Sequence, residues 1–145
     1  MLSIFFMIVY IENELDMGVN NMAKILINHL ASIRELEMDI KQINIFIGEQ
    51  ATGKSTLCKA VYYFRNFKEI LLDYYYAVGQ YGKNEKGLIK TLNSKLKDSF
   101  VSLFGYSWKL PADLSMKYCY TNDNYIQINL VHGQKNIFHY NIVRN

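Results

Sequence analysis

Polar and apolar residues alternate with a period of two near both ends of the chain, which predicts β-strands with one exposed face. In residues 33–40, the apolar Leu36, Met38 and Ile40 alternate with acidic residues. A β-rich run over residues 24–33 comes directly before this segment. We therefore expect two antiparallel strands in the first third of the chain.

The last third of the chain repeats this alternation in three segments. Their apolar positions are Leu114, Met116, Tyr118 and Tyr120, then Ile126, Ile128 and Leu130, then Phe138, Tyr140 and Ile142. Turn-forming residues separate the segments at positions 122–124 and 132–135. Three antiparallel strands in series, a β-meander over residues 113–143, are the simplest interpretation.

Between these strands the period changes. A short apolar run over residues 43–47 suits a strand that is buried on both faces of a parallel sheet. Apolar residues then recur every three or four positions, which predicts one face of a helix. These residues are Leu57, Ala60, Val61, Phe64 and Phe67.

Residues 67–105 are expected to be mainly helical. A tyrosine-rich stretch over residues 67–79 leads to a predicted mobile loop over residues 79–87, which contains two closely spaced glycines and several charged residues. A second helix is predicted over residues 88–104, ending at Gly105. Its apolar stripe consists of Leu88, Leu92, Leu96, Phe100 and Leu103.

The junction between the apolar strand and the first helix carries a sequence motif. It matches G-x-x-x-x-G-K-[ST], the phosphate-binding loop (P-loop, or Walker A motif) of nucleoside triphosphatases. The candidate binding residues are Gly48, Glu49, Gln50, Ala51, Thr52, Gly53, Lys54, Ser55 and Thr56. The alternative is a purely structural, glycine-containing turn between a strand and a helix.

The chemistry of phosphate binding explains these residue types. Glycines let the backbone N–H groups approach phosphate oxygens, and the N-terminus of the following helix adds unpaired N–H groups with a partial positive charge. Lys54 would reach the β- and γ-phosphates, and the Ser55 hydroxyl would bind Mg²⁺. The predicted fold class is α/β with α+β character, and it contains a strand–loop–helix unit flanked by antiparallel strands.

Composition narrows the function only slightly. The chain has 145 residues, about the length of one domain, and 50% of them are hydrophobic, which argues against disorder. The net charge of +3 permits a nucleic-acid partner without indicating one. Cys58 and Cys119 lack metal-ligand spacing, so we expect reduced thiols in a cytoplasmic protein. The three histidines, at positions 29, 132 and 139, are scattered and are expected to be ordinary residues.

The first residues form a separate apolar segment. Residues 1–11 are too short for a transmembrane helix, which needs about 20 residues, and they lack the features of a signal peptide. Two interpretations stay open, an extra strand or an extension from an upstream start codon, and we favour Met22 as the start. Residues 1–21 are then a leader or extension, and residues 22–145 form the nucleotide-binding lobe. No membrane association is expected.

Residues 22–67 resemble the N-terminal segment of ABC-type ATPases of the RecF and structural-maintenance-of-chromosomes kind, which are often called AAA family ATPases. The resemblance lies in residues 27–36, in residues 43–56 that include the loop, and in residues 57–61. It implies that ATP is the nucleotide and that Thr56 lies near the α-phosphate. Ala51 departs from the family, which often has glycine there, and Ala tolerates positive φ poorly. Glu49 is also unusual, and its carboxylate must point away from the phosphates.

The family's downstream motifs, a serine–glycine–glycine signature, an apolar strand ending in Asp-Glu and a switch histidine, have no convincing counterpart here. We therefore expect the front lobe of an ATPase, completed by a partner protein or by homodimerisation. Hydrolysis would need groups from elsewhere. Asp73 follows a short apolar run and is a weak candidate for a second Mg²⁺ contact.

Two other functions stay open. One is a small P-loop metabolite kinase, although Arg34, Arg65 and Arg144 are few arginines for clamping phosphates. The other is a non-enzymatic interaction module with a vestigial loop. No Asn-Lys-x-Asp motif supports guanine recognition. DNA contact through the lysines of the second helix is a minority interpretation. These lysines are Lys86, Lys90 and Lys97.

Overall fold

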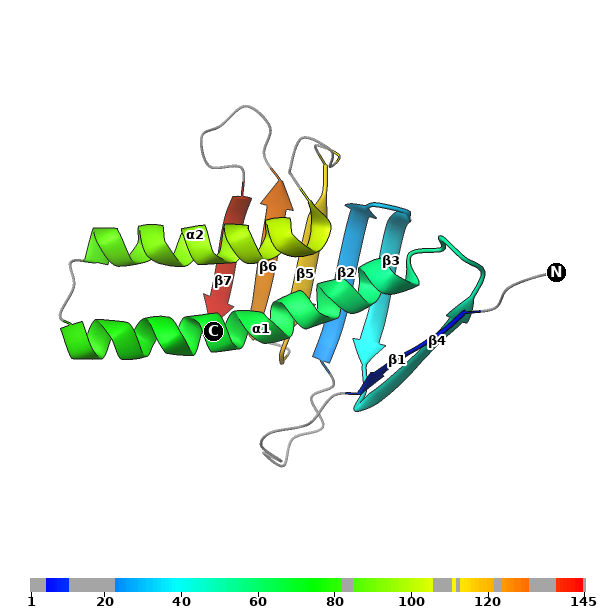
Figure 1. The fold of residues 1–145 in the computed structure, drawn as a ribbon, viewed down its shortest axis with the longest axis horizontal. Coiled ribbons are helices and arrows are strands. Elements are labelled where there is room, and N and C mark those ends of the chain that lie inside the picture. Colours follow the sequence, from blue (N-terminus) through cyan, green and yellow to red (C-terminus); the bar gives the residue numbers. More distant parts are fainter. Residues whose placement is uncertain are drawn as a thin grey trace. The chain divides into compact units, whose positions relative to one another are not determined.

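The computed structural model describes residues 5–10, 23–81, 85–105, 111, 113–121, 124–130 and 138–144. Its elements follow the order β1(Phe5–Tyr10), β2(Ala23–Leu30), β3(Ile33–Ile40), β4(Ile43–Gly48), α1(Lys54–Tyr81), α2(Glu85–Phe104), β5(Ser115–Cys119), β6(Asn124–Leu130) and β7(Phe138–Arg144) (Figure 1). The chain divides into two compact units, Met1–Cys58 with Leu110–Asn145, and Lys59–Lys109. It is a mixed α/β protein with antiparallel sheets and, in the described residues, two helices.

The first unit contains a five-stranded antiparallel sheet with the order β3-β2-β5-β6-β7. Strands β2 and β3 pair with each other, and β5, β6 and β7 form a meander, so both predictions from the alternating pattern are confirmed. The two sets are joined where β2 pairs with β5. The predicted turn at positions 132–135 lies outside the described residues.

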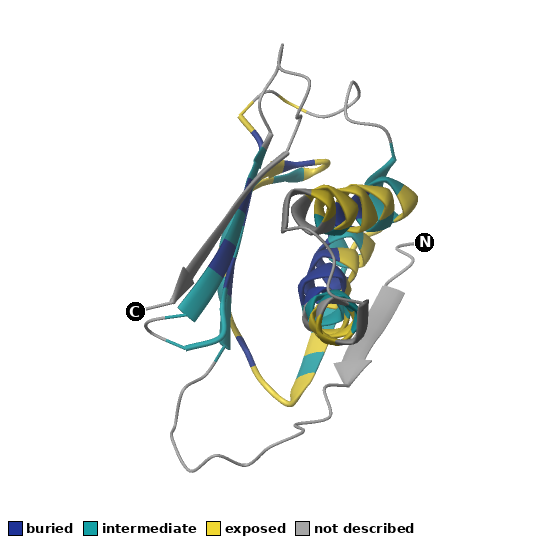
Figure 2. Ribbon diagram, turned by 90° about the vertical axis from the view of Figure 1, so that its left-hand side faces the viewer, coloured by how far each residue is buried: buried dark blue, intermediate teal, exposed yellow. Residues whose placement is uncertain are grey.

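The strand register places the apolar residues on one face of this sheet. Neighbouring strands align Met38, Ile25, Tyr118 and Ile126 in one row across the sheet. Most residues of this face are buried, and Figure 2 shows dark blue positions alternating with teal ones along the strands. The buried members are Ile25, Ile27, Ile40, Met116, Tyr118, Ile126 and Ile128.

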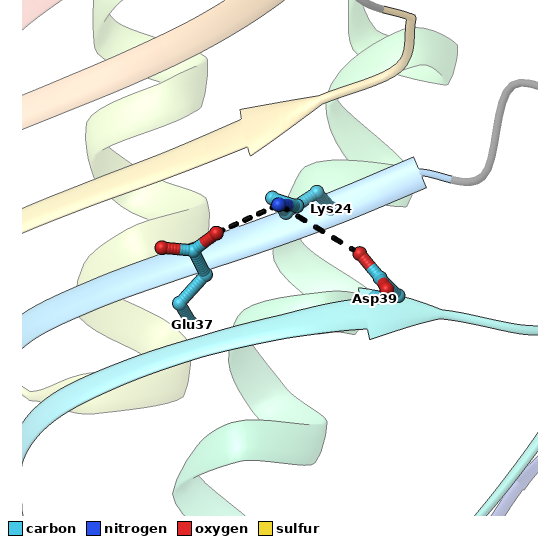
Figure 3. A network of polar contacts seen from close by, with 3 residues as sticks. All are labelled: Lys24, Glu37 and Asp39. Atoms are coloured by element: carbon cyan, nitrogen blue, oxygen red, sulfur yellow. Dashed lines mark hydrogen bonds and ion pairs between the residues drawn. The ribbon is translucent and has the colours of Figure 1, made fainter.

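The opposite face of the sheet is polar. Lys24 Nζ donates a hydrogen bond of 2.7 Å to Glu37 Oε1 and lies 3.9 Å from Asp39 Oδ1 (Figure 3). The hydrogen bond and the charge of Glu37 raise the pKa of Lys24 above its ordinary value of 10.5. Further along this face, Lys117 Nζ lies 3.8 Å from the centre of the Tyr125 ring, within cation–π range.

The strand over residues 43–47 forms as predicted, but its predicted environment is wrong. Strand β4 pairs antiparallel with β1, and its side chains are exposed or half-buried. A strand that pairs parallel with β4 would have to follow a crossover connection. Among the described residues, the strands that follow α2 are β5, β6 and β7, and they pair antiparallel in the five-stranded sheet instead. Residues 5–10 form the extra strand, one of the two interpretations that the sequence left open.

In the second unit, α1 and α2 lie side by side (Figure 1) and share an aromatic cluster around the buried Tyr63. The Tyr63 ring makes edge-to-face contacts with Phe64, Phe100 and Phe104 at centroid distances of 5.6, 5.6 and 6.4 Å. The Tyr63 hydroxyl donates a hydrogen bond of 3.2 Å to the Leu96 carbonyl. This bond satisfies the polar end of a buried side chain.

Both helices extend further than the sequence predicts. Helix α1 continues without a break through the tyrosine-rich stretch, and α2 begins at Glu85, so most of the predicted loop over residues 79–87 is helical. Residues 82–84 lie outside the described residues. A single glycine is only weakly unfavourable in a helix, so Gly79 does not end α1. The predicted end of α2 is confirmed, because Gly105 has φ 85° and its N–H donates to the Val101 carbonyl.

None of the helices in the described part of the chain is long and apolar enough to cross a membrane.

Candidate phosphate-binding loop

The motif forms the connection between β4, which ends at Gly48, and α1, which begins at Lys54. This is the strand–loop–helix arrangement that the motif requires. Two loop residues have left-handed backbone conformations, Ala51 with φ 64° and Gly53 with φ 92°. Ala51 therefore takes the positive φ that alanine tolerates poorly, at a position where the backbone favours glycine.

Gly53 is held tightly against the turn between β2 and β3. A Cβ atom at this position would lie 2.8 Å from Ile33 Cγ1 and 2.9 Å from Ser32 Oγ. Such distances are too short for carbon, and the positive φ adds strain for any other residue. Gly53 is therefore required by packing as well as by the motif. Ser32 and Ile33 support the loop from a distant part of the sequence, and the motif pattern gave no signal for them.

Gly48 is different, because a Cβ atom there would meet only ordinary contacts. It would lie 3.5 Å from Thr52 Oγ1 and 3.8 Å from Lys54 Nζ. A side chain at position 48 would thus occupy the space beside the Lys54 ammonium group. The absence of a side chain leaves this space open.

The Lys54 side chain folds back over the loop. Its Nζ atom donates to the Gly48 carbonyl at 2.9 Å, to Thr52 Oγ1 at 3.0 Å and to the Glu49 carbonyl. The Thr52 hydroxyl also donates to the Glu49 carbonyl at 2.9 Å. The loop thus curls around a positive charge that is satisfied by neutral oxygen atoms. An anion would offer stronger, charge-assisted hydrogen bonds to the same ammonium group.

The start of α1 adds further donors. The first intrahelical bond runs from the Leu57 N–H to the Gly53 carbonyl at 2.8 Å. The N–H groups of the first turn, including those of Ser55 and Thr56, have no earlier helical carbonyl to pair with. No acidic residue lies in this turn to neutralise the positive end of the helix. These residues therefore fit the phosphates of a nucleotide.

The residues fit Mg²⁺ less completely. Ser55 is exposed and could offer its hydroxyl, but the described residues contain no group of three or more histidine, cysteine, aspartate or glutamate side chains that could hold a metal ion. Mg²⁺ is often held by one or two protein oxygens together with phosphates and water, so Ser55 is sufficient as a partial ligand.

Asp73 does not share this site. It is exposed and lies about five helical turns beyond Lys54 in the continuous helix α1, far beyond the reach of an ion bound at Ser55. The Glu49 side chain is exposed on the loop.

The apolar face of β4 adjoins the loop. Ile43, Ile45 and Ile47 alternate along the strand and are 56%, 56% and 63% exposed. An open pocket of about 330 Å³ lies between Ile45 and Ile47 of β4, β3 and the loop, and Thr52, Gly53 and Lys54 form its polar part. The sequence predicted these isoleucines to be apolar strand residues, but it did not predict that they would be exposed.

The other candidate residues lie outside the loop. His29 Nδ1 lies 2.9 Å from Asp113 Oδ2 at the surface, which fits an ordinary histidine. Cys58 is buried and Cys119 half-buried, and both thiols are free, as predicted. Lys90 and Lys97 are exposed on α2, whereas the side chain of Lys86, together with residues 132 and 139, is outside the described part.

No protein-family model matches the chain, and neither the curated proteins nor the solved structures include a significant match.

Proposed function

We propose that residues 48–56 bind the triphosphate of ATP together with Mg²⁺, and that the chain is the front part of an ABC-type ATPase. One observation carries the proposal. The loop joins a strand to a helix N-terminus and encloses the Lys54 ammonium group, which donates to the Gly48 carbonyl and Thr52 Oγ1. The choice of ATP over other nucleotides rests on the sequence resemblance.

Binding would redirect hydrogen bonds that already exist. Lys54 would exchange loop oxygens for phosphate oxygens, which carry negative charge and form stronger bonds with an ammonium group. The first-turn amides of α1 would donate to the same phosphates. Mg²⁺, when bound, neutralises phosphate charge, and the exposed Ser55 hydroxyl would help to hold it.

Hydrolysis would need further residues. A group that orients the attacking water is usual in phosphoryl transfer, and the carboxylate of the loop, Glu49, is exposed and would have to point away from the phosphates. The exposed isoleucines of β4 support the idea of a missing part, because the corresponding strand in an α/β sheet is covered on both faces. A partner protein or a second subunit would supply this cover and the missing group.

A titration of Mg-ATP monitored by calorimetry tests the proposal with three proteins. The wild type should bind, and Lys54→Ala should bind at least about tenfold more weakly, because a hydrogen bond to a charged group contributes about 1.5–3 kcal/mol. Lys90→Ala is the matched control, since Lys90 is an exposed lysine on α2. It should bind like the wild type.

Two outcomes would contradict the proposal. Equal affinity of the wild type and Lys54→Ala would exclude the loop as the phosphate site, and no binding by the wild type would indicate a vestigial loop. Phosphate release is measured in the same samples, and turnover by the isolated chain would contradict the need for a partner.

A further inference from the structure

Every hydrogen-bond donor of the Lys54 ammonium group has a partner within the loop. An ammonium group carries three N–H donors and no acceptor. In Lys54 they donate to the Gly48 carbonyl at 2.9 Å, to Thr52 Oγ1 at 3.0 Å and to the Glu49 carbonyl. Lys54 can therefore form a hydrogen bond with a phosphate oxygen only after it has given up one of these three partners.

The Thr52 hydroxyl differs from the two carbonyls, because it also donates a hydrogen bond. Its single hydrogen is directed to the Glu49 carbonyl, and the two oxygen atoms lie 2.9 Å apart. In this arrangement the hydroxyl offers only lone pairs to its other neighbours. It can accept a hydrogen bond from Lys54, but it has no hydrogen left to donate to a phosphate, whose oxygens are themselves acceptors.

We propose that the Thr52 hydroxyl competes with nucleotide phosphates for Lys54 and thereby lowers the affinity of the loop for Mg-ATP. The measured affinity of a site is reduced by the fraction of molecules in which the binding group is free to bind. Thr52 is exposed, and exposed side chains change rotamer rapidly, so Lys54 can release this partner without a change in the backbone. The inference rests on the proposed function, and it makes Thr52 a positioning residue that acts on phosphate through Lys54.

The substitution Thr52→Val tests the competition, because valine keeps the branched shape of threonine and removes only the hydroxyl. The lost hydrogen bond involves a charged group but is exposed to solvent, which weakens it. In a calorimetric titration of the full chain, Thr52→Val should bind Mg-ATP about threefold to tenfold more tightly than the wild type. Thr52→Ser keeps a hydroxyl and should bind within about twofold of the wild type.

Stability in the absence of nucleotide distinguishes competition from a purely structural role. Thr52→Val loses both hydrogen bonds of this hydroxyl, so its urea midpoint should be lower than those of the wild type and Thr52→Ser. A residue that only shapes the loop would lose affinity together with stability. A competitor loses stability and gains affinity, and this opposite sign is the result that we expect.

Thr91 provides a matched control in the other unit of the chain. Its hydroxyl also donates to a backbone carbonyl, that of Gly87 at 2.9 Å, and it is exposed on α2. Thr91→Val therefore makes the same chemical change away from the loop and should leave the affinity for Mg-ATP unchanged. Equal gains in affinity in Thr91→Val and Thr52→Val would overturn the inference.

The remaining outcomes separate this inference from the proposed function. Unchanged or weaker binding by Thr52→Val, in a protein whose binding still depends on Lys54, would overturn the competition and leave the phosphate site intact. Thr52→Ser binding as tightly as Thr52→Val would also exclude the hydroxyl as the competitor. Equal binding by the wild type and Lys54→Ala, or no binding by any of these proteins, would overturn the proposed function and the competition together.

Discussion

The shape of the loop depends most on Gly53, where backbone and packing requirements coincide. Gly105 has a similar positive φ of 85°, but a Cβ atom there would meet nothing within 4 Å. The two glycines therefore separate the cost of backbone strain from the cost of a steric clash. Only at Gly53 would a side chain also collide with Ser32 and Ile33 at the β2–β3 turn.

We expect Gly53→Ala to lower the free energy of unfolding by about 2–4 kcal/mol, from strain and overpacking together. Gly105→Ala should cost about 1 kcal/mol, from strain alone. Urea unfolding of the two variants beside the wild type measures both values. Equal losses would show that Ser32 and Ile33 do not restrict position 53.

At position 51 the opposite substitution, of alanine by glycine, tests the same backbone effect. The φ of 64° at this position is unfavourable for a residue with a Cβ atom, so Ala51→Gly relieves about 1–2 kcal/mol of strain and loses about 0.4–1 kcal/mol through the greater freedom of the unfolded chain. The net result should be a gain of between about 0 and about 1.6 kcal/mol in the free energy of unfolding, measured by thermal or urea unfolding. Ala77→Gly, inside α1, is the control and should destabilise the protein by about 1 kcal/mol. Loss of stability in Ala51→Gly would contradict the left-handed conformation at position 51.

At the scale of elements, the Lys24 contacts make the pairing of β2 with β3 dependent on pH. Because Glu37 raises the pKa of Lys24 in the folded protein, the folded state holds this proton more tightly than the unfolded state. The stabilisation is fully present below the ordinary pKa of 10.5 and is lost as the pH rises through the raised value.

Unfolding of the wild type and Lys24→Met should be compared from about pH 9 to about pH 11.5. The difference in stability between them should shrink as the pH rises, because Lys24 loses its proton and with it the favourable contact with Glu37. A difference that stays constant or grows across this range would exclude the contact with Glu37 as its source.

Sequence patterns predicted which segments form strands and helices better than they predicted which of these elements pair with each other. Alternation predicted β2, β3 and the meander, because period two reports directly which side chains share a face. The same reasoning misplaced β4, since an apolar run shows that a strand needs cover but not what covers it. The close approach of Ser32 and Ile33 to Gly53 could not be predicted from the sequence either, because these residues are far apart in the chain and only the fold brings them together.

At the scale of the whole molecule, the exposed isoleucines of β4 form an apolar surface beside the loop. The face of β4 beside the loop is the surface that the proposed ATPase partner would cover.

The most direct measurement of the central claim is a titration of the isotopically labelled full chain with Mg-ATP, followed by the NMR signals of the backbone amides. The largest shifts should fall on the amides of residues 49–56, because these groups would donate to the phosphates. The same titration of Lys54→Ala should leave these signals nearly unchanged. Wild-type shifts that concentrate on other elements, or that persist in Lys54→Ala, would show that this loop is not the nucleotide site.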